Sequence, residues 1–160
     1  MDGGIRLAQQ RIYVHAAPEL VYQYVSSLGP DARVIERGEN ELVAEFVTRV
    51  GRWRVRTLER VGLEPSERIT YEQLRPVVSA QGAEEEFIFH RLANGGCELH
   101  YRGLLHPRWG PAGWALTRWL LKPLWDSVIR RHMQELKAGA EARALRSRMF
   151  PQPRPQGPLP

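Results

Sequence analysis

Two patterns at the start of the chain predict a strand and then a short helix. Residues 5–15 alternate loosely between apolar and polar positions and end in IYVHA, which is typical of a β-strand. Pro18 and Glu19 suit the first turn of a helix, because proline needs no backbone donor there and an acidic side chain interacts favourably with the positive end of the helix dipole. Gly29-Pro30 then ends the helix. Its apolar stripe consists of Leu20, Val21, Tyr24, Val25 and Leu28.

The next pattern, in residues 41–60, predicts a β-hairpin. A two-residue turn at Val50-Gly51 pairs Arg49 with Arg52 and places Glu45 opposite Arg56. Opposite charges then meet on one face and apolar side chains on the other, as expected when one face of an antiparallel pair is buried. The arginines of the charged face are Arg52, Arg54, Arg56 and Arg60. Because acidic residues lie across from them, we interpret this row as a solvated face rather than a contact for a polyanion.

Three further strands are predicted from the sequences RITYEQL, AEEEFIFHRLA and CELHYRGLL. The second and third flank Asn94-Gly95-Gly96, whose glycines suit a three-residue hairpin loop. That loop pairs Phe89 with Tyr101 and sets His90 opposite His100.

One long C-terminal helix is predicted at residues 112–146. Charged and amide side chains fall on one side of it, which is typical of an amphipathic helix that lies on a sheet. Before Pro123 the helix is apolar almost all round, and Pro123 itself predicts a kink or a separation into two segments. At 100° per residue, the expected inner face consists of Trp114, Leu121, Trp125, Val128, His132, Leu136 and Gly139.

The predicted order is therefore a strand, a helix, about six antiparallel strands and a long helix. This chain resembles the START/birch-pollen-allergen superfamily, also called SRPBCC, which includes polyketide cyclase/dehydrase-like proteins. The resemblance extends over residues 4–146. The sequences that carry it are IYVHAAPELVYQYV, SERITYEQL, EFIFHRLANGGCELHY and HMQELKAGAEA.

The resemblance implies an α+β helix-grip fold. In that fold a curved antiparallel sheet, here of about six to seven strands, wraps around the long C-terminal helix, and a short helix follows the first strand. We expect one such domain at residues 1–147. The prolines of residues 148–160 predict a tail that joins neither helix nor sheet and is disordered or polyproline II.

The resemblance also implies an apolar cavity between sheet and helix that carries a small hydrophobic ligand such as a lipid, a quinone or a polyketide. A mostly apolar lining with a few polar groups suits a ligand with a polar end. A polyketide cyclase or dehydratase and a non-catalytic regulatory or interaction module are the alternative functions. The residues predicted to line the cavity are Trp53, Val55, Thr57, Ile69, Tyr71, Gln73, Phe87, Phe89, Leu99, Tyr101, Trp125, Val128, His132 and Leu136.

Glu85, His132 and Tyr101 are the candidate catalytic residues. A buried Glu85 carboxyl would have a raised pKa and could exchange protons with a ligand, whereas at a strand end it would reach water or an arginine. His132 could shuttle protons, or one hydrogen bond could satisfy it at the margin of the core. Cyclase or dehydratase chemistry requires the three side chains to converge on one void.

Four of the five tryptophans lie in the stretch WGPAGWALTRWLLKPLW. Trp109, Trp114 and Trp119 are predicted at the mouth of the pocket, where they close it or make a transient contact with a membrane surface. Arg118 and Lys122 lie nearby for anionic headgroups. Packing of Trp119 on a neighbouring subunit or loop is the alternative.

Charge and composition indicate which partners and cofactors to expect. Residues 1–100 carry a net charge of −3 and residues 101–160 carry +8, which together give +5. The basic part lacks a nucleic-acid-binding motif, so no nucleic-acid partner is expected. The single cysteine, Cys97, and the scattered histidines give no metal-ligand spacing, and no cofactor motif is present. The start of the chain lacks a secretion signal and no apolar run reaches about 18 residues, so we expect a cytoplasmic protein.

Overall fold

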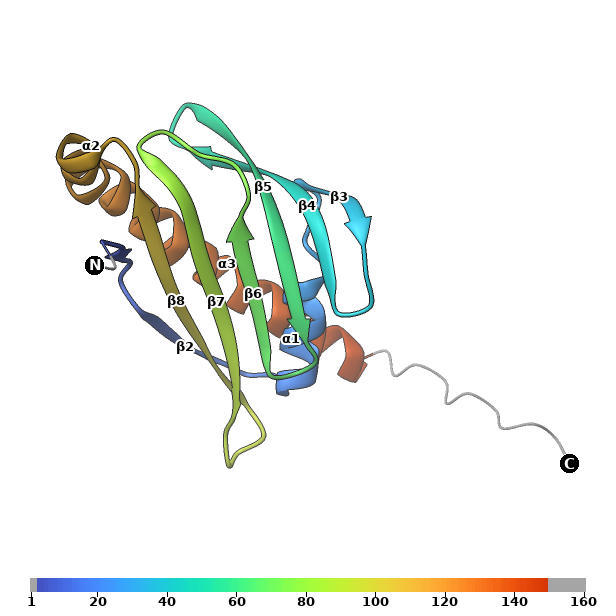
Figure 1. The fold of residues 1–160 in the computed structure, drawn as a ribbon. Helices are drawn as coiled ribbons and strands as arrows, with labels where there is room; N and C mark the ends of the chain where they lie inside the picture. Colours follow the sequence, from blue (N-terminus) through green and yellow to red (C-terminus); the bar gives the residue numbers. More distant parts are fainter. Residues whose placement is uncertain (1–2, 150–160) are drawn as a thin grey trace, which may run out of the picture.

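The computed structural model describes residues 3–149 and has the expected order of elements (Figure 1). Two short strands, a helix and six longer strands precede one nearly continuous C-terminal helical stretch. The elements are β1 (Ile5–Arg6), β2 (Gln10–Val14), α1 (Pro18–Ser26), β3 (Ala32–Arg37), β4 (Glu41–Val50), β5 (Trp53–Glu64), β6 (Arg68–Gln73), β7 (Ala80–Arg91), β8 (Cys97–Pro107), α2 (Gly110–Leu116), the π-helix η1 (Thr117–Leu121) and α3 (Lys122–Met149).

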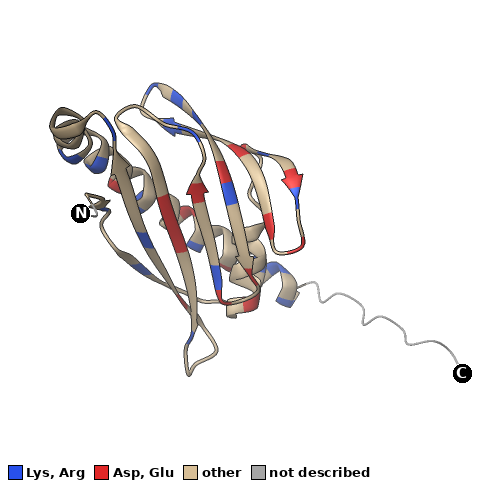
Figure 2. Cartoon of the chain, viewed as in Figure 1, with Lys and Arg blue, Asp and Glu red and all other residues tan. Residues whose placement is uncertain are grey.

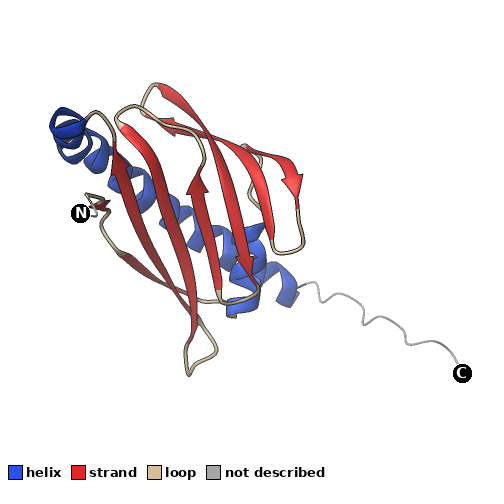
Figure 3. Cartoon of the chain, in the orientation of Figure 1, coloured by secondary structure: helices blue, strands red, loops and turns tan. Residues whose placement is uncertain are grey.

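All the strands form one antiparallel sheet in the order β1-β8-β7-β6-β5-β4-β3, and β2 pairs with β8 as well. The sheet is curved and open, and the helices lie on one side of it with α3 running across the strands (Figure 3). The α+β helix-grip fold predicted from the sequence is confirmed. β3 has almost no buried side chains, which explains why its sequence gave no strand pattern.

The core lies between the concave face of the sheet and one side of α3. Alternate residues of the central strands point toward the helix, and Val61, Ile69 and Leu99 have no exposed surface. The short helix α1 packs against the far part of α3, where a Cβ on Gly139 would lie 1.9 Å from the hydroxyl of Tyr24. Glycine at this position lets the two helices approach closely.

The predicted hairpin registers are wrong by two residues. Val50 pairs with Trp53 around a Gly51-Arg52 turn, so Glu45 lies opposite Leu58 rather than Arg56. The turn is displaced because Gly51, with φ +60°, supplies the left-handed conformation at its first central position. A shift of two residues leaves every side chain on its predicted face, because the period of a strand is two.

The second hairpin is displaced in the same way. Tyr101 pairs with Phe87 rather than Phe89, because the connecting loop is longer than three residues. His90 lies opposite Glu98, yet its ring centroid is 4.3 Å from that of His100, its diagonal neighbour.

The helical stretch begins at Gly110, and its buried stripe differs from the predicted one. The π-turn of η1 adds a residue to the helical repeat just before Pro123, so a face counted from Trp114 at 100° per residue is misplaced further along. Trp114 is 44% exposed, and Met133 rather than His132 reaches the core. Pro123 lies in the first turn of α3. The buried residues of α3 are Ile129, Met133, Leu136, Ala140 and Ala144. α3 ends at Met149, and the predicted tail beyond it lies outside the described residues.

Gly113 provides a test of how tightly α2 is joined to β8. A Cβ at this position would lie 1.4 Å from the backbone carbonyl oxygen of Arg108, so any side chain forces the backbone to move. We expect Gly113→Ala to lower the free energy of unfolding by about 3 kcal/mol in urea titration. The exposed neighbour Ala112→Ser, the matched control, should change it by less than about 0.5 kcal/mol. Equal stability of the two variants would contradict the close approach.

Candidate functional site

A row of aromatic rings crosses the concave face of the sheet beneath α3. The ring centroids of Phe46 and Tyr71 are 6.0 Å apart, those of Tyr71 and Phe87 are 5.8 Å apart, and those of Phe87 and Tyr101 are 5.3 Å apart. These residues come from β4, β6, β7 and β8, so the row spans most of the sheet. We call this concave face, together with the side of α3 that faces it, the inner surface.

The inner surface is not fully covered by its own side chains. Tyr71 and Trp125 point inward but are only half-buried, and the side chain of His132 is 49% exposed. The inner surface therefore keeps accessible area at these three residues. Two hollows lie away from the inner surface, at the β5–β6 turn (about 330 Å³) and the β3–β4 turn (about 200 Å³).

Glu85 of β7 is the centre of a polar cluster on this surface. Its Oε1 accepts hydrogen bonds from the hydroxyl of Tyr101 and, at 2.8 Å, from the indole Nε1 of Trp125. The three side chains come from β7, β8 and α3, so the cluster joins the sheet to the helix. Burial raises the pKa of Glu85, and the two hydrogen bonds oppose this effect.

The two oxygens of the Glu85 carboxyl differ in their hydrogen bonds. No hydrogen bond reaches Oε2 from residues 3–149. No buried side-chain nitrogen or oxygen among these residues lacks a partner, so Oε2 must keep accessible surface. When Glu85 is protonated, its proton belongs on Oε2, because Oε1 already accepts two hydrogen bonds. Burial and the adjacent Glu85 charge raise the pKa of Tyr101, so its hydroxyl remains a donor.

A second inward carboxyl, that of Glu59 on β5, was not among the predicted site residues. It accepts a hydrogen bond from the Thr57 hydroxyl at 2.5 Å. Burial raises the pKa of Glu59 to about 7, with a smaller contribution from the negative charge of Glu85. The alternation of side chains along the strand could have identified it, because Glu59 lies two residues after Thr57 and so shares its inward face.

His132 does not join this cluster through a hydrogen bond within the described residues. Its ring lies 6.4 Å from that of Phe87, and its Nδ1 is 3.9 Å from the carboxylate of Glu135. Burial lowers its pKa and Glu135 opposes this effect. Of the three candidate catalytic residues, the structure brings Glu85 and Tyr101 together, and Trp125 is the third member of the cluster.

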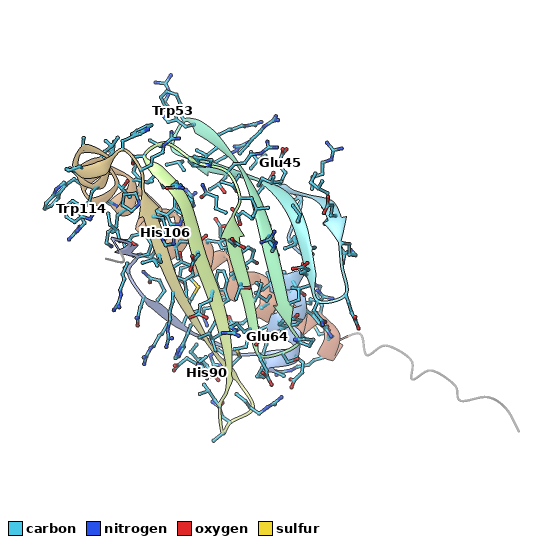
Figure 4. The ribbon with its side chains drawn as sticks, viewed as in Figure 1. Glu45, Trp53, Glu64, His90, His106 and Trp114 are labelled. Carbon is cyan, nitrogen blue, oxygen red and sulfur yellow. The ribbon has the colours of Figure 1, made fainter. Side chains whose placement is uncertain are left out.

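The other predicted site residues fall into three groups. Trp53 begins β5 and points away from the sheet, with 78% of its surface exposed (Figure 4). The predicted mouth residues Trp109, Trp114 and Trp119 are all exposed as well. Val55 and Val128 are half-buried. The buried ones are Thr57, Ile69, Gln73, Phe87, Phe89, Leu99, Tyr101 and Leu136.

Residues 3–149 indicate neither a metal site nor a reactive cysteine. No group of three or more His, Cys, Asp or Glu side chains there could hold a metal ion. Cys97 is fully buried, and burial raises the pKa of its thiol to about 11, which makes it a poor nucleophile. No helix in this part of the chain is both long and apolar enough to cross a membrane.

Comparison with solved structures identifies the architecture. The Zhui aromatase/cyclase from Streptomyces sp. R1128 matches with a TM-score of 0.72 and 16% identity, over 90% of this chain and 95% of that one. A START superfamily protein from Mycobacterium smegmatis matches with a TM-score of 0.60 and 13% identity, over 89% and 99% of the two chains. The chain therefore shares the fold of these two proteins.

A third match agrees with this assignment. Ara h 8.0201 has a TM-score of 0.61 and 10% identity, over 89% of this chain and 99% of that one. No family model matches the chain, and no curated protein matches its sequence. The START-like fold therefore rests on the arrangement of the elements.

The Glu59 carboxyl predicts a pH dependence of stability. Its pKa is about 7 in the folded chain against an ordinary value of 4.5, so the folded state binds more protons between these pH values. Stability is therefore highest below about pH 4.5 for this group and falls as pH rises through about 7, by at most about 3 kcal/mol. We expect Glu59→Gln to lose less stability than the natural chain between about pH 5 and pH 8, measured by urea titration.

The matched control is Glu45→Gln, which removes a carboxyl from the outward face of β4. It should leave the pH dependence unchanged. If Glu59→Gln and the natural chain lose stability equally over this range, folding does not raise the pKa of Glu59 and the prediction is wrong.

Proposed function

We propose that this protein binds a small hydrophobic molecule with a polar oxygen on its inner surface. The observation that supports the proposal is the Glu85 carboxyl, whose Oε1 is held by Tyr101 and Trp125 while Oε2 stays accessible. A mostly apolar surface with one oriented polar group is the usual composition of a small-molecule site.

Phe46 and Tyr71, the partly exposed members of the aromatic row, supply contact surface for such a ligand. Rings that meet edge to face, as Tyr71 and Phe87 do, offer flat apolar surface that packs well against another ring system. Protonated Glu85 then donates a hydrogen bond from Oε2 to a carbonyl or hydroxyl oxygen of the ligand, worth about 1 kcal/mol. Polyketide-like molecules and quinones combine rings with such oxygens and fit this description better than a saturated lipid.

A second candidate is a cyclase or dehydratase, and the carboxyl pair favours it. Glu59 can take up a proton near neutral pH, and the raised pKa of Glu85 suits a general acid. In a dehydration, Glu59 would remove a proton from carbon and Glu85 would give its proton to the departing hydroxyl, which leaves as water. The similar aromatase/cyclase structures make this chemistry compatible with the fold. A regulatory module with a filled interior is less compatible with the partly exposed inner surface.

A pair of matched probes tests the binding proposal. We expect the natural chain, at a pH acidic enough to protonate Glu85, to bind 2-acetylnaphthalene about fivefold more tightly than 2-ethylnaphthalene in equilibrium dialysis, because only the ketone accepts the Glu85 hydrogen bond. This preference should disappear as the pH rises and Glu85 ionises. Glu85→Gln should keep the preference at every pH, because its amide nitrogen donates from the position of Oε2 without titrating.

Glu84→Gln is the control, since Glu84 lies on the outward face and pairs with His106. It should behave like the natural chain. Equal affinity of the natural chain for both probes, or no binding of either, would overturn the proposal.

The enzyme candidate makes a separate prediction. A β-hydroxy aryl ketone should lose water to give an enone, followed by its ultraviolet absorbance, and Glu59→Gln and Glu85→Gln should each remove the activity. Unchanged turnover in either variant would exclude the carboxyl pair as its acid and base.

A further inference from the structure

Three segments of the chain contain no acidic residue, and they meet at one end of the sheet. Residues 46–58, 73–83 and 99–125 together hold nine Lys and Arg and no Asp or Glu. Antiparallel pairing places the β4–β5 turn, the β6–β7 connection and the β8–α2 junction at the same end (Figure 1). Figure 2 shows basic but no acidic positions at the β4–β5 turn, and α2 itself carries neither. We call this the acid-free end.

The acid-free end also carries most of the exposed large apolar side chains. Trp53 is 78% exposed and Trp119 is 72% exposed. Figure 4 shows Trp53 and Trp114 pointing away from the body of the protein. Exposed apolar groups concentrated in one region mark a contact surface, whereas scattered ones are ordinary. The members at this end are Trp53, Leu74, Val78, Trp109, Trp114, Leu116, Trp119, Leu120 and Leu124.

Two of these exposed residues have an unfavourable backbone conformation. Val78 has φ +50° and Trp109 has φ +67°, a left-handed conformation that is unfavourable for bulky residues. Both side chains are exposed, so packing does not compensate for the unfavourable backbone conformation. The helical segment itself is fixed, because the buried hydroxyl of Thr117 bonds to the Ser79 hydroxyl at 2.8 Å and to its carbonyl at 3.1 Å.

Two of the tryptophans are paired with arginines. The guanidinium of Arg108 lies 4.1 Å from the centre of the Trp109 ring, and that of Arg118 lies 5.2 Å from the centre of the Trp119 ring. This combination of an indole and a cation suits the headgroup region of a bilayer, where the ring reaches the acyl boundary and the cation meets phosphate. Lys122 contributes less, because it forms an ion pair with Asp126.

We propose that the acid-free end docks on an anionic lipid surface. Arg102 and Lys122 form ion pairs with Glu86 and Asp126, and the other seven of its nine cations form no ion pair within residues 3–149, so this end has an excess of positive charge that complements a negatively charged bilayer. Two copies of the same end would repel each other, which disfavours self-association through it. Aliphatic side chains such as Leu116, Leu120 and Leu124 give lipid contact but would find no partner in the phosphate backbone of a nucleic acid.

Co-sedimentation with vesicles tests this docking. We expect the natural chain to bind vesicles of phosphatidylcholine and phosphatidylserine, mixed at roughly 7:3, more tightly than pure phosphatidylcholine vesicles, and to dissociate as salt is raised. Arg118→Gln should weaken binding to the anionic vesicles about fivefold, the effect of one cation near the surface. Trp119→Ser should weaken it about tenfold.

Matched controls lie away from the acid-free end. Arg37→Gln on β3 and Leu145→Ser near the end of α3 remove an exposed cation and an exposed apolar side chain, and each should change vesicle binding less than twofold. Glu85→Gln should also bind vesicles normally, which separates this proposal from the ligand site.

Several results would overturn the proposal. Equal affinity for charged and uncharged vesicles would remove the role of the cations. Equal losses in Arg37→Gln and Arg118→Gln would show that net charge rather than this surface is responsible. Absence of vesicle binding together with a concentration-dependent mass that Trp119→Ser abolishes would assign the surface to a second copy of the chain.

Discussion

The hydrogen-bonded carboxyl of Glu85 connects the two halves of this fold. A carboxyl group cannot be buried without partners except at considerable cost. Here one oxygen accepts from Tyr101 of β8 and from Trp125 of α3, so the same group that needs the partners also fixes the position of the helix over the sheet. The neighbouring aromatic rings provide the apolar surroundings that raise its pKa. The side chain proposed to recognise the ligand oxygen therefore also contributes to the attachment of α3.

The fold could be predicted from the sequence because its main signals are local. The alternation along β6 and β7 placed Tyr71 and Phe87 on the inner face, and slipping a hairpin by two residues did not change this. The registers themselves depend on backbone conformation in the turns, which side-chain alternation does not encode. Gly51 shows the difference, because its left-handed φ displaced the turn by one residue.

The site was less predictable because it depends on contacts between distant elements. Glu85 and Tyr101 were candidates because alternation along their strands places them on the inner face. Trp125, which joins them, lies 40 positions after Glu85 in the sequence. The π-turn of η1 moved the helix face, so His132 was expected where Met133 lies. Glu59 follows the same alternation as Thr57, and it was overlooked because a charged residue in a strand usually points to solvent.

The central claim is that protonated Glu85 donates a hydrogen bond from its second oxygen to the ligand, and infrared difference spectroscopy tests it most directly. Glu85→Gln identifies the carbonyl band of the protonated Glu85 carboxyl by its disappearance. The account predicts that this band persists to a higher pH than that of an exposed glutamate and shifts when 2-acetylnaphthalene is added, because the ligand oxygen then accepts the proton on Oε2. A band that is lost at the pH at which an exposed glutamate ionises, or that stays in place when the ketone is bound, would contradict it.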